Sequence, residues 1–89
     1  MTLSKFGKKE AKTGLGEAIR KIRIQTLTSQ KKFGQECGVC FRTVCLWEQG
    51  KAIPTPKHAN AIVEVADEYD VRQSYIDYFM IEYSNIASL

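Results

Sequence analysis

The chain has 89 residues, of which 44% are hydrophobic, and it carries a net charge of +3. This length suits one small domain, and the apolar content excludes a chain that is disordered over most of its length. The sequence contains no apolar run long enough to span a membrane, and its first residues lack the apolar core of a signal peptide. We therefore expect a cytoplasmic protein whose three cysteines are reduced.

Charge is divided unevenly along the chain. Residues 1–57 contain twelve Lys and Arg but only four Asp and Glu, a net charge of +8. Residues 58–89 contain one Arg and six acidic residues, a net charge of −5. Such a division favours a polyanion as the partner of the basic half. The alternative is that the lysines only solvate exposed helix faces.

The first predicted helix follows a basic arm. Residues 1–13 contain four lysines and little apolar periodicity, so we expect a flexible arm that lies along phosphates or serves as a solubilising tail. Thr13 can cap a helix over residues 15–26, because hydroxyl side chains accept hydrogen bonds from the first free N–H groups. The apolar face of this helix contains Leu15, Ala18, Ile19 and Ile22.

Two short helices joined by a tight turn are predicted for residues 30–49. Ser29 can cap the first of them, and Gly38 falls at the corner, where glycine adopts a positive φ without a steric clash. Gly34 lies on the face that the second helix crosses, where a larger side chain would push the two helices apart. The inward-facing residues, which recur three or four positions apart, are Phe33, Cys37, Val39, Val44 and Trp47.

A small residue, a glycine four positions later and a β-branched residue six positions further on form the helix-turn-helix pattern. With the stretch GVCFRTVCLWEQGKAIP, the chain resembles the DNA-binding helix-turn-helix family of lambdoid phage repressors and Cro proteins (Xre-like) over residues 15–71. The resemblance implies an all-α, five-helix, repressor-like DNA-binding domain over residues 14–71. Residues 41–48 would then form the helix that enters the major groove.

The resemblance also implies which exposed residues contact DNA. Arg42 is expected to bind guanine O6 and N7 together, and apolar side chains can contact a thymine methyl group or fit the shape of the groove. The alternative is that the outward apolar face of this helix packs against protein. The expected base-contacting residues are Phe41, Arg42, Cys45 and Leu46. The expected backbone-contacting residues are Gln30, Lys31, Thr43, Gln49 and Lys51.

A structural ion pair between Arg23 and Glu48 is a further implication of the resemblance. In the register of the family, Arg23 of the first helix reaches Glu48 at the end of the groove-entering helix. An arginine suits this role because its fork binds a carboxylate through two parallel hydrogen bonds. The alternative is two unrelated surface charges.

The remainder of the chain is predicted to form one more helix and a dimerisation segment. Thr55 and Pro56 can begin the helix as its cap and first-turn proline. Residues 72–89 contain more apolar residues than one small domain can cover, arranged on either a helix or a β-strand. We expect this segment to join two copies in a homodimer. The candidate dimerisation residues are Tyr75, Ile76, Tyr78, Phe79, Met80, Ile81 and Tyr83.

Cysteines raise the question of a metal site, because Cys37 and Cys40 form a CxxC pair and Cys45 follows. A structural zinc site has four ligands, and the single histidine, His58, lies on another element, so we expect no metal and no cofactor. We interpret the cysteines as small packing residues, with Cys45 the most reactive because it faces outward. No catalytic set or phosphate-binding loop is recognisable, which predicts a protein that is not an enzyme.

The resemblance therefore implies a homodimeric transcriptional repressor, of phage, plasmid or bacterial origin, that binds a pseudo-palindromic DNA operator in the cytoplasm or nucleoid of a bacterial cell. Two alternatives stay open. One is an antitoxin that represses its own operon and binds a toxin through its apolar tail. The other is a protein-interaction module without DNA affinity, which docks a protein on Phe41, Cys45 and Leu46.

Overall fold

The structure, a computed structural model, describes residues 14–87. These residues form five helices and no strand, so the expected all-α architecture is confirmed. None of the five helices combines the length and the apolar character that crossing a membrane requires. The basic arm expected at residues 1–13, with its Thr13 cap, lies outside the described residues. The helices are α2 (Gly14–Thr26), α3 (Gln30–Cys37), α4 (Phe41–Glu48), α5 (Pro56–Glu68) and α6 (Gln73–Ala87).

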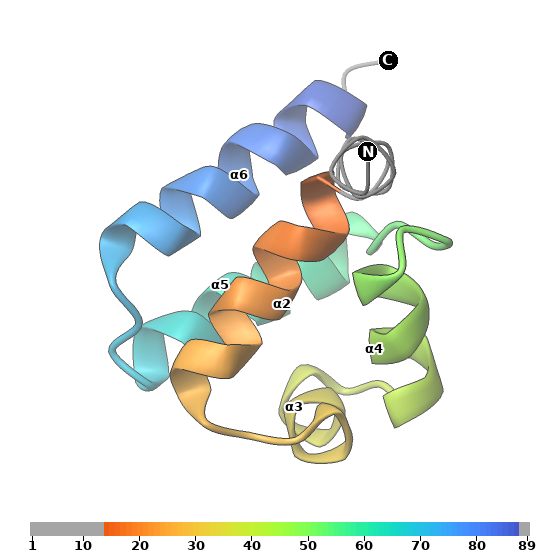
Figure 1. Ribbon diagram of the computed structural model, residues 1–89, viewed down its shortest axis with the longest axis vertical. Helices are drawn as coiled ribbons and strands as arrows, with labels where there is room; N and C mark the ends of the chain where they lie inside the picture. The colour runs from red at the N-terminus through yellow and green to blue at the C-terminus, as the bar shows by residue number, and fades with distance from the viewer. Residues whose placement is uncertain (1–13, 88–89) are drawn as a thin grey trace, which may run out of the picture.

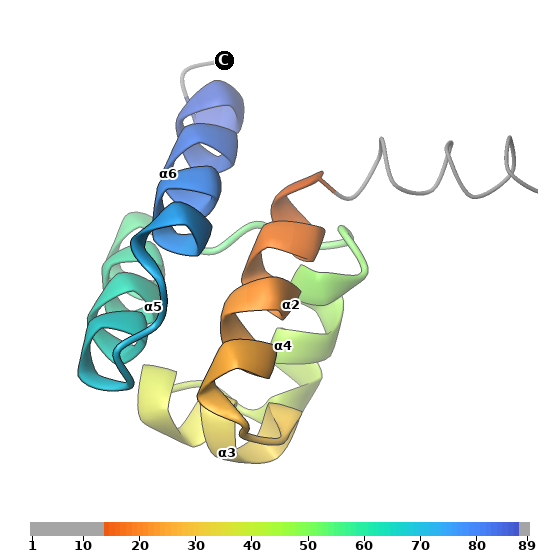
Figure 2. The ribbon, with the colours of Figure 1, turned by 60° about the vertical axis from the view of Figure 1, so that its left-hand side comes forward.

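One hydrophobic core joins all five helices, and α2 lies at its centre. In Figure 1, α6 runs along one side of α2, α4 lies on the other side, and α5 lies behind. Figure 2 shows α3 closing the lower end of the bundle. Apolar residues three or four positions apart give each helix one buried face. The largest fully buried side chains come from every helix, and they are Ile19, Ile22, Phe33, Val44, Ile62 and Phe79.

The tail of the chain is helical rather than extended. α6 packs along α2 more extensively than any other helix does, and this packing buries Ile76 and Phe79. Both residues are candidates for the dimer interface, and their side chains fill the core of their own chain. Among the other dimerisation candidates, Met80 and Ile81 are exposed, and Tyr75, Tyr78 and Tyr83 are half-buried.

The turn between α3 and α4 has the local features that its sequence predicts. Ser29 Oγ accepts a hydrogen bond of 3.0 Å from the Lys32 N–H at the start of α3. Gly38 ends α3 with a φ of 85°, and the Val39 N–H donates to the Gly34 carbonyl at 2.8 Å. A Cβ added at Gly34 would lie 2.7 Å from the Val39 carbonyl oxygen. Glycine at this position therefore permits the close approach of the two helices.

A loop connects α4 to α5 and is attached to α6. Gly50 follows the end of α4 with a φ of 76°, a conformation that glycine adopts readily. Thr55 caps α5 through its hydroxyl group, and Pro56 occupies the first turn. The Tyr83 hydroxyl donates to the Pro54 carbonyl at 2.9 Å, which holds the loop against α6.

Candidate nucleic-acid interface

A carboxylate at the end of α4 joins three helices. Arg23 of α2 donates to Glu48 from Nε at 2.6 Å and from Nη2 at 3.1 Å, so the expected ion pair is present in a bidentate form. Gln30, the first residue of α3, donates from Nε2 to the same carboxylate at 3.0 Å. Hydrogen bonding to Glu48 raises the pKa of Arg23 above its ordinary value. This Arg23–Glu48–Gln30 junction fixes α4 relative to α2 and α3.

Gln30 and Cys45 form hydrogen bonds with other side chains of the same chain. The Cys45 thiol donates to Gln30 Oε1 at 3.2 Å, and Gln30 Nε2 is already bound to Glu48. Each side chain therefore forms a hydrogen bond inside the protein, where the sequence predicts a phosphate contact for Gln30 and a base contact for Cys45. The sequence pattern could not indicate this pairing, because the partners lie on different helices and only their folded arrangement brings them together.

The outer face of α4 carries the remaining base-contacting candidates. Phe41 is 53% exposed and Leu46 is 36% exposed, and the Arg42 side chain between them in sequence is exposed as well. Together with Cys45 and Gln49, these side chains line a shallow hollow, which we call the α4 hollow. The structure thus gathers the four predicted base-contacting residues and Gln49 around one depression of the surface.

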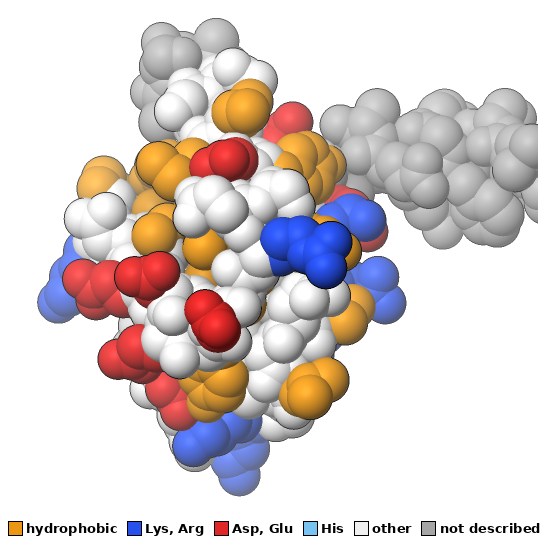
Figure 3. All heavy atoms as spheres, turned by 90° about the vertical axis from the view of Figure 1, so that its left-hand side faces the viewer, with side chains coloured by type: hydrophobic (Ala, Val, Ile, Leu, Met, Phe, Trp, Pro, Cys, Tyr) orange, Lys and Arg blue, Asp and Glu red, His pale blue; other side chains and the backbone are white. Residues whose placement is uncertain are grey.

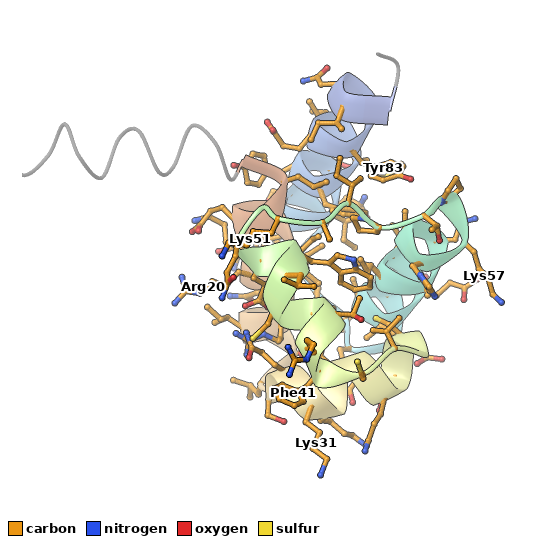
Figure 4. The ribbon with its side chains drawn as sticks, turned by 90° about the vertical axis from the view of Figure 1, so that its right-hand side faces the viewer. Arg20, Lys31, Phe41, Lys51, Lys57 and Tyr83 are labelled. Carbon is orange, nitrogen blue, oxygen red and sulfur yellow. The ribbon has the colours of Figure 1, made fainter. Side chains whose placement is uncertain are left out.

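Cations from three elements surround the α4 hollow. In Figure 4 Phe41 lies at the lower end of α4, with Lys31 of α3 below it, Lys51 of the following loop above it and Arg20 of α2 to one side. These three cations and Arg42 are exposed, and none of them forms an ion pair with a carboxylate of residues 14–87. A face with such uncompensated positive charge attracts polyanions.

Arg20 is a member of this basic face that sequence reasoning missed. The spacing of Arg20 and Arg23 could have indicated this, because residues three apart on a helix lie on neighbouring positions of one face. Arg23 reaches Glu48 of α4, and Arg20, one turn earlier on α2, projects to one side of α4, in a hollow that Tyr75 of α6 also lines. The signal depends on knowing the partner of Arg23, which only the packing of α2 against α4 supplies.

The three cysteines have three different environments. Cys37 is buried in the core, and burial raises the pKa of its thiol to about 12. Cys40 is exposed at the start of α4, where hydrogen bonding to the Thr43 hydroxyl, 3.6 Å away, lowers its pKa. Cys45, which the sequence predicts to be the most reactive, is half-buried and hydrogen-bonded to Gln30, whereas Cys40 is exposed. Within residues 14–87, no three potential metal ligands among His, Cys, Asp and Glu come together.

Acidic side chains gather on the opposite side of the molecule. Figure 3 views this side, formed by α5 and α6, and shows carboxylates spread among apolar side chains. Figure 3 also shows Lys and Arg side chains beside these carboxylates, so the charge division along the sequence is only in part a division between this side and the α4 side of Figure 4. The exposed carboxylates of α5, α6 and their connection belong to Glu64, Asp67, Glu68, Asp70 and Asp77.

A second hollow lies between α5 and α6, and we call it the α5–α6 groove. Most of its lining is apolar, and Met80 on its rim is exposed. Figure 4 shows Tyr83, another lining residue, and Lys57 at the start of α5 on the same side of α4. The apolar residues that line the groove are Pro56, Ala59, Val63, Phe79, Met80 and Tyr83.

No protein-family model, no curated protein and no solved structure matches this chain.

Proposed function

We propose that this protein is a helix-turn-helix transcriptional regulator of the Cro and repressor type, which binds a pseudo-palindromic DNA operator as a homodimer. In this proposal α3, the turn at Gly38 and α4 form the helix-turn-helix unit of a repressor-like domain, and α4 enters the major groove. The resemblance of residues 15–71 to this family supports the assignment.

The observation that carries the proposal is the composition of the face around α4. Phe41, Arg42 and Leu46 are exposed on one short helix, and Lys31 and Lys51 flank that helix without an ion-pair partner among the described residues. The carboxylates of α5 and α6 lie on the other side, where they do not repel a polyanion bound to α4. This combination suits duplex DNA, whose phosphates attract cations and whose groove admits one helix.

Each group in this face has a distinct role in the proposed complex. Arg42 donates two hydrogen bonds to a guanine, which specifies sequence. Lys31 and Lys51 neutralise phosphates on the flanking strands, which sets affinity and register but carries no sequence information. The Arg23–Glu48–Gln30 junction keeps α4 at a fixed angle, so the helix itself does not have to be ordered when Arg42 binds.

Selection of binding sites from random duplexes, followed by a salt titration of the selected duplex, tests the proposal. We expect an inverted repeat whose half-sites lie about one helical turn (~34 Å) apart. We also expect the logarithm of the association constant to fall linearly with the logarithm of the salt concentration, because cations on the protein release counterions from DNA. A chain that binds no duplex at low salt would contradict the proposal.

A protein-interaction module is the second candidate, and the exposed apolar side chains of Phe41 and Leu46 favour it. Such side chains can dock against another protein as well as in a DNA groove. The two candidates differ in their response to salt, because apolar contacts persist where phosphate contacts weaken. Protein partners that remain bound at high salt, together with no DNA affinity, would favour this candidate.

The α5–α6 groove is the proposed contact between the two copies of the homodimer. Its apolar lining and the exposed Met80 and Ile81 form hydrophobic surface that a second copy can cover. Met80→Glu is expected to dissociate the dimer, because it places a charge in an apolar contact. Ile53→Glu is the matched control, since Ile53 is equally apolar and exposed but lies in the loop between α4 and α5.

Sedimentation equilibrium of the wild type and these two variants measures the dimer constant. We expect Met80→Glu to be monomeric at concentrations where the wild type and Ile53→Glu are dimeric. A wild-type chain that stays monomeric at every concentration, and that still binds DNA, would contradict the dimer. That result would leave the groove for a different protein, as in the antitoxin alternative.

A further inference from the structure

The α4 hollow is unusual in its chemistry for a surface that reads DNA bases. Base edges in the major groove present mostly hydrogen-bond donors and acceptors. Five side chains line the hollow, and only Arg42 and Gln49 among them have hydrogen-bonding groups that are not already used within the protein. The Cys45 thiol donates to Gln30. Phe41 and Leu46 contribute apolar surface alone.

The apolar surface has one specific counterpart in the major groove. Thymine carries a methyl group on C5, which is the apolar group that distinguishes its edge from those of the other bases. The exposed cations Lys31, Lys51 and Arg20 surround the hollow, so a DNA duplex is favoured over an uncharged ligand at this position. Phe41 and Leu46 would then cover methyl groups while Arg42, between them in sequence, binds its guanine.

We propose that the operator half-site contains thymines whose methyl groups pack against Phe41 and Leu46, beside the guanine that Arg42 binds. This inference rests on the proposed function, since it names the base chemistry that the same α4 face recognises. Burial of the methyl groups removes apolar surface of both partners from water, which favours the complex. Specificity on this face is therefore divided between one charged contact and two apolar contacts.

Removal of single methyl groups from the DNA tests the inference. In the half-site obtained by selection from random duplexes, each thymine is replaced in turn by deoxyuridine, which keeps the same base pairing but lacks the methyl group. We expect the dissociation constant to rise about fourfold at each position that faces Phe41 or Leu46, the effect of exposing one buried methyl group. Replacements outside the half-sites are expected to leave the constant unchanged.

Protein variants then assign the effect to side chains. Phe41→Ala is expected to abolish the uracil effect at one group of thymine positions, and Leu46→Ala at another. Ile24→Ala is the matched control, because Ile24 is an exposed apolar residue on α2 and is not part of the α4 hollow. This control is expected to keep the full uracil effect. Circular dichroism of each variant verifies that the helices are retained.

Three results would overturn the inference while DNA binding itself stands. They are a selected half-site without thymine, no change on uracil replacement, and a uracil effect that is the same in all three variants. The last result would indicate that the methyl groups act through the shape of the DNA. Absence of binding to every duplex is a different result, which would overturn the proposed function and this inference with it.

Discussion

The Glu48 carboxylate connects α2, α3 and α4 at a single point, because it accepts hydrogen bonds from both Arg23 and Gln30. The side chains of Arg23 and Glu48 are only 16% and 6% exposed. The pair between Lys21 and Glu17 is longer, at 3.9 Å, and its side chains are 45% and 37% exposed. Charges that are shielded from water interact more strongly and cost more to leave unpaired. The two pairs are therefore expected to differ in their contribution to stability.

Glu48→Gln is expected to lower the free energy of unfolding by about 3 kcal/mol, because it leaves Arg23 charged and largely buried without a counter-charge. The matched control is Glu17→Gln, which breaks the exposed pair and is expected to cost less than about 1 kcal/mol. Urea unfolding of both variants measures the difference. Equal losses in the two variants would show that burial does not distinguish these pairs.

Substitutions of Arg42 and Lys51 distinguish base recognition from phosphate contact in the proposed DNA complex. Arg42→Ala is expected to weaken binding to the selected operator by about 1–3 kcal/mol and to relax the base preference at one position. Lys51→Ala, the control, is expected to weaken all duplexes alike and to reduce the salt slope by about 1. Fluorescence anisotropy with selected and scrambled duplexes measures both effects. If both variants lost affinity uniformly, the assignment of Arg42 to base recognition would be wrong.

At the scale of elements, the approach of α3 to α4 depends on two glycines that act for different reasons. A Cβ at Gly34 would lie 2.7 Å from the Val39 carbonyl oxygen and 3.2 Å from Val44 Cγ2. A Cβ at Gly38 would meet no atom within 4 Å, but the φ of 85° there disfavours any other residue. Gly34 is therefore limited by packing between the helices, and Gly38 by backbone conformation.

Alanine substitution distinguishes these two constraints. Gly34→Ala is expected to destabilise the protein by about 2–3 kcal/mol, since the contacting atom belongs to the backbone and the helices must move apart. Gly38→Ala is expected to cost about 1 kcal/mol, and Gly38→Asn less, because asparagine tolerates the left-handed conformation. Thermal unfolding of the three variants gives the order. A Gly38→Ala variant less stable than Gly34→Ala would contradict this account of the turn.

At the scale of the whole molecule, the separation of charge between two faces gives the protein a preferred orientation toward a polyanion. Exposed cations without an ion-pair partner lie around α4, and the exposed carboxylates of the described residues lie on α5, α6 and their connection (Figures 3 and 4). A polyanion is attracted to one face and repelled by the other, which raises the rate of productive encounters at low salt.

Stability of the whole chain is expected to fall in alkali. Burial raises the pKa of Cys37 to about 12, so the folded protein keeps this proton at a pH where the unfolded chain releases it. The resulting stabilisation is complete below the ordinary pKa of 9.0 and is lost as the pH rises through about 12, with a slope of up to about 1.4 kcal/mol per pH unit. The raised pKa values of Tyr69 and Tyr78, caused chiefly by desolvation, act in the same direction.

Cys37→Ala isolates the contribution of the thiol, because it retains both tyrosines. We propose to measure the free energy of unfolding at about pH 8 and about pH 10.5. Its decrease between these pH values is expected to be about 2 kcal/mol smaller in the variant than in the wild type. Urea unfolding at the two pH values measures the loss. An identical pH dependence in the wild type and the variant would show that the thiol does not contribute.

The sequence by itself determined the local structure, because capping and turn formation depend on residues that are neighbours along the chain. Ser29, Gly38 and Thr55 begin or end their helices where their side chains or backbone preferences indicate. The division of charge could also be read from the sequence, since it follows the order of residues. The helix-turn-helix function inferred from this pattern stays a prediction that the binding experiments above test.

Only the tertiary structure decided which surface each side chain faces. The apolar residues of α6 are compatible with two faces, and packing against α2 assigns Ile76 and Phe79 to the core. Gln30 and Cys45 likewise look exposed on their own helices, but the crossing of α3 and α4 brings them into contact. The physical reason is that helical periodicity defines positions around one axis, whereas burial and pairing depend on the distances between axes, which long-range packing sets.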